Sequence, residues 1–569
     1  MSREANRFTR RSLLKLGGCA AAGSVLLPAL QGCARNLLKL PLPFGGQVKG
    51  ERYAAGHELR DGRLAVQVPP AEGPLHDAVI IGGGPCGLAC AWKLLRSGME
   101  SVLVVDKEDV LGGLCRGGTE DGLSFVVGSH YTDFPHPACK HLGELFQELG
   151  IIVGFTETGW PIIDERTFLK QRDARNIFTG SVWHHDEFPH PLASGRDERE
   201  LERFEETCRR WSSWADGKNR PAFGIPIARI SRAPEVRALD EISLTTWLER
   251  EGYRSDLLRW FLTNRLQDEY GTPIERLPAW AGIQFFRTVL PDPDAADRGN
   301  EPNSLTWDEG LGFLGRRMDA LLPDAWKRTG LWAVRVENLE GGRVRTICYD
   351  PRRRSFHTFL SRHAVVAVPK MQVYDLVCDL EAAGRTEFED LPYVSWLVAV
   401  VHLDRLPTFP GGSVGWDNLL YGSWTLGYLD NQHQHTPAVA PDKPHVLSLY
   451  AAFPYNTKQE RYEMLSYGWD YWARLILLEL ERAHPDIRRC IRKMDIWKWG
   501  HPMRQTHVGT IFGPLRRQMC RPFGHVHFGH ADVCAIPVFE EASARGVEIA
   551  ESILADLGVD FRSSLEVFD

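Results

Sequence analysis

The 569-residue sequence lacks several features that would assign it to other classes of protein. Its 12 cysteines include no C-x-x-C pair and no cluster with histidines, so we expect no metal site and no disulfide framework. No stripe of basic residues is present, and the formal net charge of -7 is modest for this length. These properties argue against nucleic-acid binding. The length allows two or three globular domains.

The N-terminal segment also lacks an apolar run long enough to span a membrane, because the apolar stretch over residues 16–30 is short and consists mostly of small residues. Residues 9–15 read Thr-Arg-Arg-Ser-Leu-Leu-Lys and resemble a twin-arginine export signal. Residues 30–33 read Leu-Gln-Gly-Cys and resemble a lipoprotein cleavage box. We expect a signal peptide over residues 1–33, export to the periplasm or cell envelope, and a lipid tether at Cys33. Residues 34–74 are predicted to be a linker.

A strand, a glycine-rich turn and a helix follow the linker. Residues 78–81 form an apolar run typical of a buried parallel strand. The spacing G-x-G-x-x-G then occurs at Gly82, Gly84 and Gly87. In a dinucleotide-binding unit the first glycine permits a tight turn, the second leaves room for a pyrophosphate, and the third lets the helix approach the strand. We predict a helix over residues 88–97 whose N-terminus faces the phosphates.

The second strand of this unit ends at Asp106, about 20 residues after the glycines. A carboxylate there can accept hydrogen bonds from a ribose diol. Strand, turn, helix, strand and acid occur in the required order. The sequence therefore predicts dinucleotide binding.

A second glycine pair at Gly112 and Gly113 makes the pattern more specific. Together with the first fingerprint, it resembles the flavin proteins of the amine oxidase superfamily. That group includes monoamine and polyamine oxidases, protoporphyrinogen oxidase, phytoene desaturases and UDP-galactopyranose mutase. The resemblance implies non-covalently bound FAD, with the glycine pair against its diphosphate. Leu114 stands where the superfamily commonly has arginine, and Arg116 is our candidate replacement.

Two later segments extend the resemblance. Residues 332–336 are similar to the strand whose backbone contacts the adenine ring, and Val334 is the residue we favour. Residues 527–550 resemble the final superfamily signature, in which Asp532 would bond the diphosphate or ribityl region. The Val538 amide would then face flavin O2 at a helix start. His530 and Glu541 stand where the superfamily usually has glycine.

The fold class implied is α/β, with a Rossmann-like FAD-binding domain around a parallel sheet and an α+β substrate domain made of insertions. We expect the FAD-binding domain in three parts, over residues 75–150, 306–375 and 506–569. A helical insertion is predicted over residues 151–305. A substrate-domain sheet is predicted over residues 376–505.

The predicted activity is FAD-dependent hydride removal from a small amine, polyamine or apolar compound, with oxygen, a quinone or a protein as electron acceptor. No lysine occurs in residues 394–400, where amine oxidases commonly place one near the flavin. His130 is the candidate catalytic residue, although it could instead bond backbone or cofactor. His501 and Lys498 are further candidates. A flavin-dependent mutase or isomerase and a non-catalytic flavin protein remain as alternatives.

Overall fold

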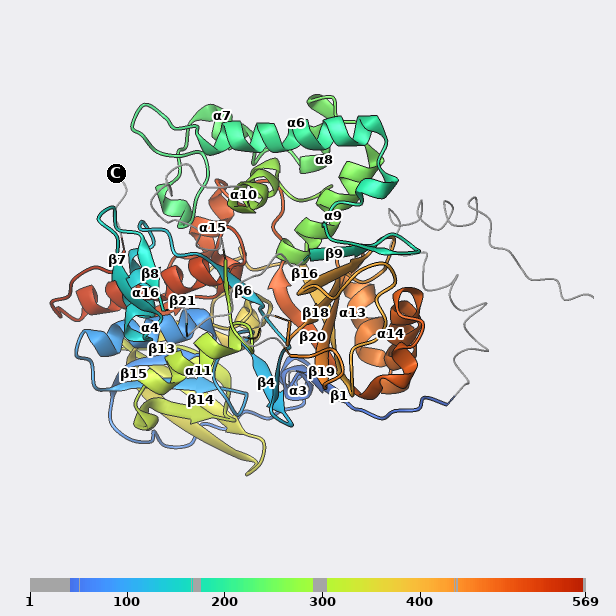
Figure 1. The fold of residues 1–569 in the computed structure, drawn as a ribbon. Helices are drawn as coiled ribbons and strands as arrows, with labels where there is room; N and C mark the ends of the chain where they lie inside the picture. Colours follow the sequence, from blue (N-terminus) through green and yellow to red (C-terminus); the bar gives the residue numbers. More distant parts are fainter. Residues whose placement is uncertain are drawn as a thin grey trace, which may run out of the picture. The chain divides into compact units, whose positions relative to one another are not determined.

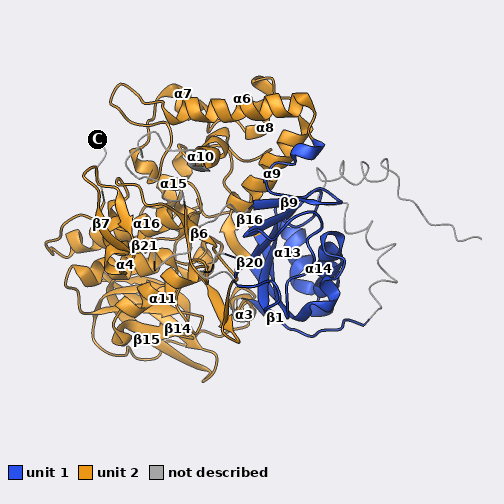
Figure 2. Ribbon diagram, viewed as in Figure 1, with its two compact units in different colours: residues 1–50, 173–192, 395–499 blue, residues 51–172, 193–394, 500–569 orange. Residues whose placement is uncertain are grey.

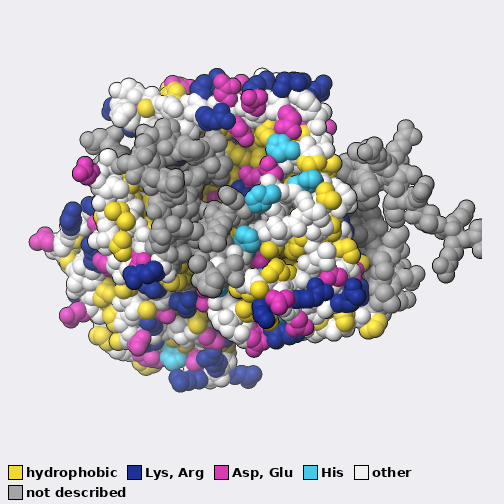
Figure 3. All heavy atoms as spheres, in the orientation of Figure 1, with side chains coloured by type: hydrophobic (Ala, Val, Ile, Leu, Met, Phe, Trp, Pro, Cys, Tyr) yellow, Lys and Arg dark blue, Asp and Glu magenta, His cyan; other side chains and the backbone are white. Residues whose placement is uncertain are grey.

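A computed structural model describes residues 41–50, 52–164, 166, 175–289, 304–433, 435 and 439–565. The twin-arginine motif and Cys33 lie outside these residues. The chain divides into two compact units (Figure 2): unit 1 has residues 1–50, 173–192 and 395–499, and unit 2 has the remainder. Among the described residues, none of the helices combines the length and apolar character needed to span a bilayer. Both signs of charge are interspersed on the face shown in Figure 3.

Unit 2 is built on a seven-stranded sheet whose main path runs β12-β3-β2-β15-β14-β13, with β21 also paired to β15. Strands β12, β3, β2, β15 and β21 pair in parallel, whereas β13 and β14 are antiparallel. The strand bounds are β12 Lys327–Thr329, β3 Val102–Asp106, β2 His76–Ile81, β15 Ser355–Val366, β14 Arg343–Asp350, β13 Trp332–Leu339 and β21 Val526–Phe528. The predicted parallel central sheet is confirmed.

Helices cover this sheet because alternate side chains of its central strands point to opposite faces. Ala78 and Ile80 of β2 pack in one apolar cluster, and Val79 and Ile81 pack in another. The first cluster contains residues from α4 (Pro85–Arg96), α5 (Lys140–Glu148), α11 (Gly312–Leu321) and α16 (Phe539–Asp556). The second includes residues from α12 (Val373–Leu376) and α15 (Pro514–Met519). A sheet buried on both faces accounts for the continuous apolar run at β2.

Helices α4 and α16 lie side by side (Figure 1), and a glycine permits their close approach. A Cβ added at Gly546 of α16 would lie 2.1 Å from the Cys86 carbonyl oxygen of α4. No side chain larger than hydrogen fits there without moving backbone. The first predicted helix therefore has a fixed neighbour from the far end of the chain. It starts at Pro85, three residues earlier than predicted, because proline is well suited to a first helical position.

The rest of unit 2 contains a group of helices and three short strand pairs. The helices are α6 Gly195–Ser212, α7 Pro234–Ala238, α8 Leu244–Arg250, α9 Asp256–Tyr270 and α10 Ala279–Val289, with α3 Ala54–Arg60 elsewhere in the unit. The strand pairs are β4 Gly117–Glu120 with β5 Leu123–Val126, β7 Ile152–Phe155 with β8 Pro161–Ile163, and β6 Tyr131–Asp133 with β11 Ser304–Thr306. Helices α8 and α9 are separate, because Gly252 has φ +78° between them and Ser255 caps α9.

Unit 1 contains an eight-stranded sheet in the order β1-β20-β16-β19-β18-β17-β9-β10. Its strands are β1 Val48–Gly50, β20 Ile491–Arg504, β16 Tyr393–Leu403, β19 His445–Phe453, β18 Gly427–Asp430, β17 Asp417–Leu420, β9 Arg175–Phe178 and β10 Trp183–His184. Strands β16 and β19 pair in antiparallel fashion, with Ser395–Leu403 opposite His445–Phe453, within the substrate-domain sheet predicted over residues 376–505. Helices α13 (Thr457–Ser466) and α14 (Trp469–Ala483) follow β19, and Tyr467 and Gly468 separate them.

The two units differ from the predicted domain list in two places. Within the predicted linker over residues 34–74, β1 pairs in parallel with residues 496–498, and α3 is helical. Within the predicted insertion over residues 151–305, residues 173–192 join unit 1 while the helices that follow join unit 2. Strands of two to four residues carry too little periodicity to be recognised in a sequence. Their long-range pairing decides where they belong.

Candidate dinucleotide-binding site

The carboxyl ends of β2, β15 and β21 meet at one edge of the unit 2 sheet, because the three strands are parallel. The glycine loop leaves β2 there, and the segment of Asp532 follows β21. A Cβ at Gly82 would lie 2.6 Å from the Ala367 carbonyl oxygen, just after β15. The Lys370 amide donates to Asp532 Oδ2 at 2.9 Å. The phosphate-loop glycines and the C-terminal signature are therefore brought together, as the sequence predicted.

The three fingerprint glycines have different surroundings. Gly82 has φ +100°, and a Cβ at Gly87 would lie 1.9 Å from the Gly82 carbonyl oxygen. Both positions are restricted to glycine by the protein itself. A Cβ at Gly84 would instead meet only the Gly113 Cα, at 3.9 Å. Gly84 thus borders space that a side chain would fill, as expected for a residue approached by a diphosphate.

The second glycine pair lies against this loop. The Gly112 amide donates to the Gly83 carbonyl at 2.7 Å. A Cβ at Gly113 would lie 2.9 Å from the Gly84 Cα. Helix α4 begins at the same place, with Gly84 as its N-cap residue and no side-chain cap. The backbones of Gly84 and Gly113, which carry no side chains, therefore meet at the uncapped N-terminus of α4. This arrangement suits an anionic ligand.

Asp106, the last residue of β3, holds the glycine loop after β2 by a hydrogen bond. Its Oδ2 accepts the Gly83 amide at 2.7 Å, and its Oδ1 accepts the Glu108 amide at 2.8 Å. Burial raises the pKa of this carboxyl, and the two amide donors work against that rise. Each carboxylate oxygen retains a second lone pair. A role in binding ribose remains a prediction.

Arg116 and Val334 both follow this strand end in the chain, and neither is shown to contact Asp106 directly. Arg116 Nη1 lies 3.7 Å from the Glu108 carboxylate, so its guanidinium is held near the residues after β3. Val334 is buried on β13 at an irregularity in the pairing with β14. Three residues earlier, the Leu331 amide donates to the Asp106 carbonyl at 3.0 Å. The diphosphate and adenine roles remain predictions.

Asp532 is held by residues that the sequence did not single out. Besides the Lys370 amide, its Oδ2 accepts the Tyr393 hydroxyl, and its carbonyl accepts Arg504 Nη1 at 2.6 Å. Its Oδ1 is buried, lies 3.0 Å from His530 Nδ1 and accepts no hydrogen bond among the described residues. Burial alone would raise its pKa, but His530, Tyr393 and the Lys370 amide hold the Asp532 pKa well below its usual value.

His530 adopts a backbone conformation that is nearly restricted to glycine, with φ 140° and ψ 159°. Such a conformation costs about 1–3 kcal/mol for other residues and persists only where neighbours enforce it. Here the Asp532 amide donates to His530 Nδ1 at 3.2 Å. The histidine found in place of the usual glycine therefore orients the acid that follows it.

Val538 is the N-cap residue of α16, in an extended conformation, so the predicted helix start is confirmed. Glu540 and Glu541 in the first turn are buried. Glu540 Oε1 accepts the Asp133 amide, and Glu541 Oε1 accepts the Ile227 amide at 2.7 Å. Both acids therefore have partners away from the Val538 amide. Its contact with flavin remains a prediction.

The three catalytic candidates have different environments. His130 is half-buried just before β6, and its carbonyl accepts the Thr306 hydroxyl at 2.7 Å. Lys498 lies in unit 1, where its Nζ donates to two backbone carbonyls, which indicates a structural role. The His501 ring lies 5.6 Å from the Tyr393 ring, edge to face. Tyr393 also bonds Asp532, so His501 contacts a residue that holds that acid.

The comparisons with known proteins agree with this geometry. Residues 80–149 match the family model of the NAD(P)-binding Rossmann-like domain. Dimethylglycine dehydrogenase of Rattus norvegicus is 29% identical over 111 residues, 20% of this chain and 13% of that protein. A putative flavin-containing monoamine oxidase of Mycobacterium tuberculosis is 30% identical over 172 residues, 30% of this chain and 32% of that protein. The chain thus spans a third or less of the length of these relatives.

Solved structures match over most of the chain. A putrescine oxidase variant gives a TM-score of 0.62 at 16% identity, covering 85% of this chain and 99% of that one. Cyclohexylamine oxidase from Brevibacterium oxydans gives 0.58 at 17% identity, covering 85% and 100%. A fatty acid isomerase from P. acnes gives 0.58 at 14% identity, covering 84% and 98%. The chain therefore contains a segment that matches a Rossmann-like NAD(P)-binding domain, and it has the fold shared by these solved structures.

Gly84→Val tests whether this loop binds a dinucleotide. The backbone at Gly84 has φ -79° and ψ -174°, which valine adopts readily, and the protein leaves space for the side chain. Because Gly84 is the N-cap residue of α4 and valine is disfavoured there, we expect the free energy of unfolding of the apoprotein to fall by about 1 kcal/mol, which leaves the protein folded. Bound dinucleotide should be lost, measured by absorbance and mass spectrometry of the heat-released cofactor.

Gly217→Ala is the matched control, because its Cβ meets no atom within 4 Å and lies away from the loop in sequence. It should retain the cofactor. Full cofactor content in Gly84→Val would contradict the assignment of this loop.

Burial of Lys370 at this edge of the sheet predicts that the free energy of unfolding depends on pH. Its Nζ is buried and donates to the Val366 and Val368 carbonyls, and burial lowers its pKa to about 8. In the unfolded chain a lysine keeps its proton up to about pH 10.4. Between these values the unfolded state binds more protons, so the free energy of unfolding rises with pH, by up to about 1.4 kcal/mol per pH unit.

Lys370→Met removes this contribution. Urea unfolding of the two apoproteins at pH 8 and pH 9.5 should show a stability gain for the unmodified chain that exceeds the mutant's gain by about 1–2 kcal/mol. Equal gains in both proteins would mean that the ammonium is hydrated in the folded state.

Proposed function

We propose that this chain is an FAD-dependent oxidoreductase that removes a hydride from a small organic substrate. The observation that carries the proposal is the convergence of the glycine loop, the second glycine pair and the Asp532 segment at one sheet edge. The fold shared with putrescine and cyclohexylamine oxidases supports it. FAD, when bound, supplies the hydride-accepting chemistry, and the protein supplies position, electrostatics and exclusion of water.

The residues present fit FAD at the phosphate end. Gly84 and Gly113 leave bare backbone for the diphosphate, and the α4 N-terminus offers partial positive charge. Asp106 is placed to accept a ribose hydroxyl, since each of its oxygens has a free lone pair. Arg116 is the proposed cationic partner of the diphosphate. Val334 is the proposed backbone contact of adenine.

Asp532 suits the ribityl chain better than the diphosphate. Its pKa is held well below the usual value, so the group is a carboxylate at neutral pH. A carboxylate repels a diphosphate at hydrogen-bonding distance, whereas a hydroxyl can donate to it. The buried Oδ1, whose one nearby nitrogen belongs to His530, is the acceptor we assign to a ribityl hydroxyl. The α16 N-terminus at Val538 would stabilise negative charge on the flavin carbonyl side.

Amines and polyamines are the substrate class that the structural relatives favour. No lysine occurs on β16 between residues 393 and 403, so the proposed reaction does not use a lysine from that strand. His130 and His501 are the imidazoles proposed to orient substrate or accept a proton. Oxygen, a quinone or a protein is the proposed electron acceptor.

A second candidate is a flavin-dependent isomerase, because a fatty acid isomerase shares the fold over 84% of this chain. In that case the substrate would be rearranged without net consumption of an oxidant. The two candidates share the same cofactor site. They differ in whether the substrate is oxidised overall, which leaves the flavin reduced when no electron acceptor is present.

Anaerobic titration distinguishes these candidates. The purified protein should carry an oxidised flavin spectrum, and heat should release free FAD. A panel of monoamines, diamines, polyamines, amino acids, porphyrinogens and unsaturated fatty acids is then added without oxygen. Loss of the oxidised flavin absorbance with one amine class supports the oxidase, because only net hydride transfer bleaches the flavin. Gly84→Val protein serves as the flavin-free control.

Product formation without bleaching, and only after the flavin has been reduced chemically, would favour the isomerase instead. A correctly folded protein that contains no flavin, and takes up none on addition of FAD, would contradict both candidates.

We also propose export by the twin-arginine route with a lipid anchor at Cys33. The motif at residues 9–15 and the Gly-Cys pair at residues 32–33 support this. Replacing Arg10 and Arg11 by lysine should leave the protein in the cytoplasm, and Cys33→Ala should release it from membranes, both measured by cell fractionation. Unchanged distribution of both variants would contradict the proposal. Since the twin-arginine route carries folded proteins, the cofactor would be inserted before export.

A further inference from the structure

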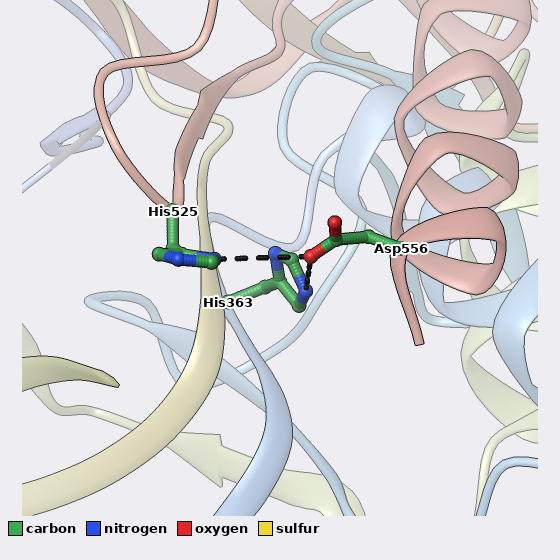
Figure 4. A group of neighbouring side chains, drawn as sticks. All are labelled: His363, His525 and Asp556. Carbon is green, nitrogen blue, oxygen red and sulfur yellow. Dashed lines mark ion pairs between the residues drawn. The ribbon is translucent and has the colours of Figure 1, made fainter. Parts of the chain in front are cut away.

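A cluster of two histidines and one aspartate lies at the end of α16 that is far from the dinucleotide loop (Figure 4). His363 belongs to β15, His525 directly precedes β21, and Asp556 is the last residue of α16. Helix α16 has 18 residues and so spans about 27 Å. Gly546, ten residues before the last residue of α16, lies against Cys86 at the start of α4, so about 15 Å of helix lies between the glycine loop and this cluster. The cluster is therefore separate from the proposed catalytic region.

The three ligand atoms already lie close together. Asp556 Oδ2 is 3.1 Å from His363 Nε2 and 3.9 Å from His525 Nδ1, and all three atoms lie within 4.8 Å of one another. Zinc bonds of about 2.0–2.2 Å in a tetrahedron place neighbouring ligand atoms about 3.3–3.6 Å apart. Small side-chain rotations would reach this spacing. His525 and Asp556 have side chains that are 40% and 58% exposed, so an ion has access from solvent.

A second imidazole orients the buried ligand. His363 Nδ1 lies 3.1 Å from His527 Nε2. Hydrogen bonding at one ring nitrogen fixes the tautomer and the direction of the other, as is usual for histidine ligands of metals.

The position of Asp556 also favours a cation. The carbonyl groups at a helix C-terminus carry partial negative charge, so a carboxylate there is unfavourable. The last turn of α16 contains no basic residue. The neighbouring Arg362 lies 3.4 Å from Asp77, so its charge is directed to another acid. A bound cation would compensate both the carboxylate and the helix end.

We propose that His363, His525 and Asp556 bind one Zn²⁺ ion, with water completing its coordination. Two imidazole nitrogens and one carboxylate oxygen form a donor set that suits this borderline metal. The ion would fasten the C-terminal end of α16 to β15 and to the start of β21. This site is independent of the proposed oxidoreductase activity.

His357 provides a matched control on the same strand. It lies on β15, and its Nδ1 is 2.9 Å from one carboxylate oxygen of Glu72. It forms a histidine–carboxylate pair but belongs to none of the three-residue groups suited to a metal among the described residues. His357→Ala should therefore leave zinc binding unchanged.

The test is zinc titration of full-length protein without a histidine tag, after treatment with a chelator. Calorimetry should show about one site, and zinc should raise the midpoint of thermal unfolding. His525→Ala, at an exposed position that folding tolerates, should weaken zinc binding at least about tenfold and abolish the thermal shift. Asp556→Asn should do the same, and His527→Ala should weaken binding about 10- to 100-fold.

Diffraction data collected at the zinc absorption edge should show an anomalous peak between the three ligand atoms. No binding below millimolar zinc, or equal binding by the wild-type and His525→Ala proteins, would overturn the proposal and leave a histidine–aspartate ion pair. Flavin content is measured in parallel. Zinc binding lost with full flavin content shows that the two sites are independent, and absence of flavin with zinc binding intact would refute only the oxidoreductase.

Discussion

The structure depends on backbone atoms approaching closely at the carboxyl edge of the unit 2 sheet. A Cβ at Gly87 would lie 1.9 Å from one carbonyl oxygen, and a Cβ at Gly113 would lie 2.9 Å from the Gly84 Cα. These contacts exclude side chains at the positions that shape the loop. They leave Gly84 as the position where space remains. A site for a diphosphate follows from this constraint, because the ligand requires bare amide groups rather than side chains.

Helix α16 packs against one face of the sheet and runs from near this edge to the histidine–aspartate cluster. Gly546 allows it to lie against α4, so the last long helix of the chain is fixed to the first helix of the fingerprint. Its first turn carries two buried acids, each of which accepts a backbone amide. Its last residue, Asp556, lies close to His363 of β15 and to His525, which directly precedes β21. The same helix thus carries the proposed flavin contact at Val538 and packs against α4 of the unit 2 core.

The sequence predicted those parts of the site that depend on local pattern. The G-x-G-x-x-G spacing, the strand before it and Asp106 were each readable from neighbouring residues, whereas the helix start at Val538 was implied by the resemblance to the amine oxidase superfamily. The donors around Asp532 were not. Lys370, Tyr393 and Arg504 are between 28 and 162 positions away in the chain, and no local signal marks such partners. Short strands such as β1 were missed because pairing, rather than composition, creates them.

A crystal structure of the protein as purified from its own host tests the central claim most directly. The account predicts density for FAD with its diphosphate between Gly84 and Gly113 and with a ribityl hydroxyl bonded to Asp532 Oδ1. An empty loop after saturation with FAD, or a cofactor bound at some other edge of the sheet, would contradict the account.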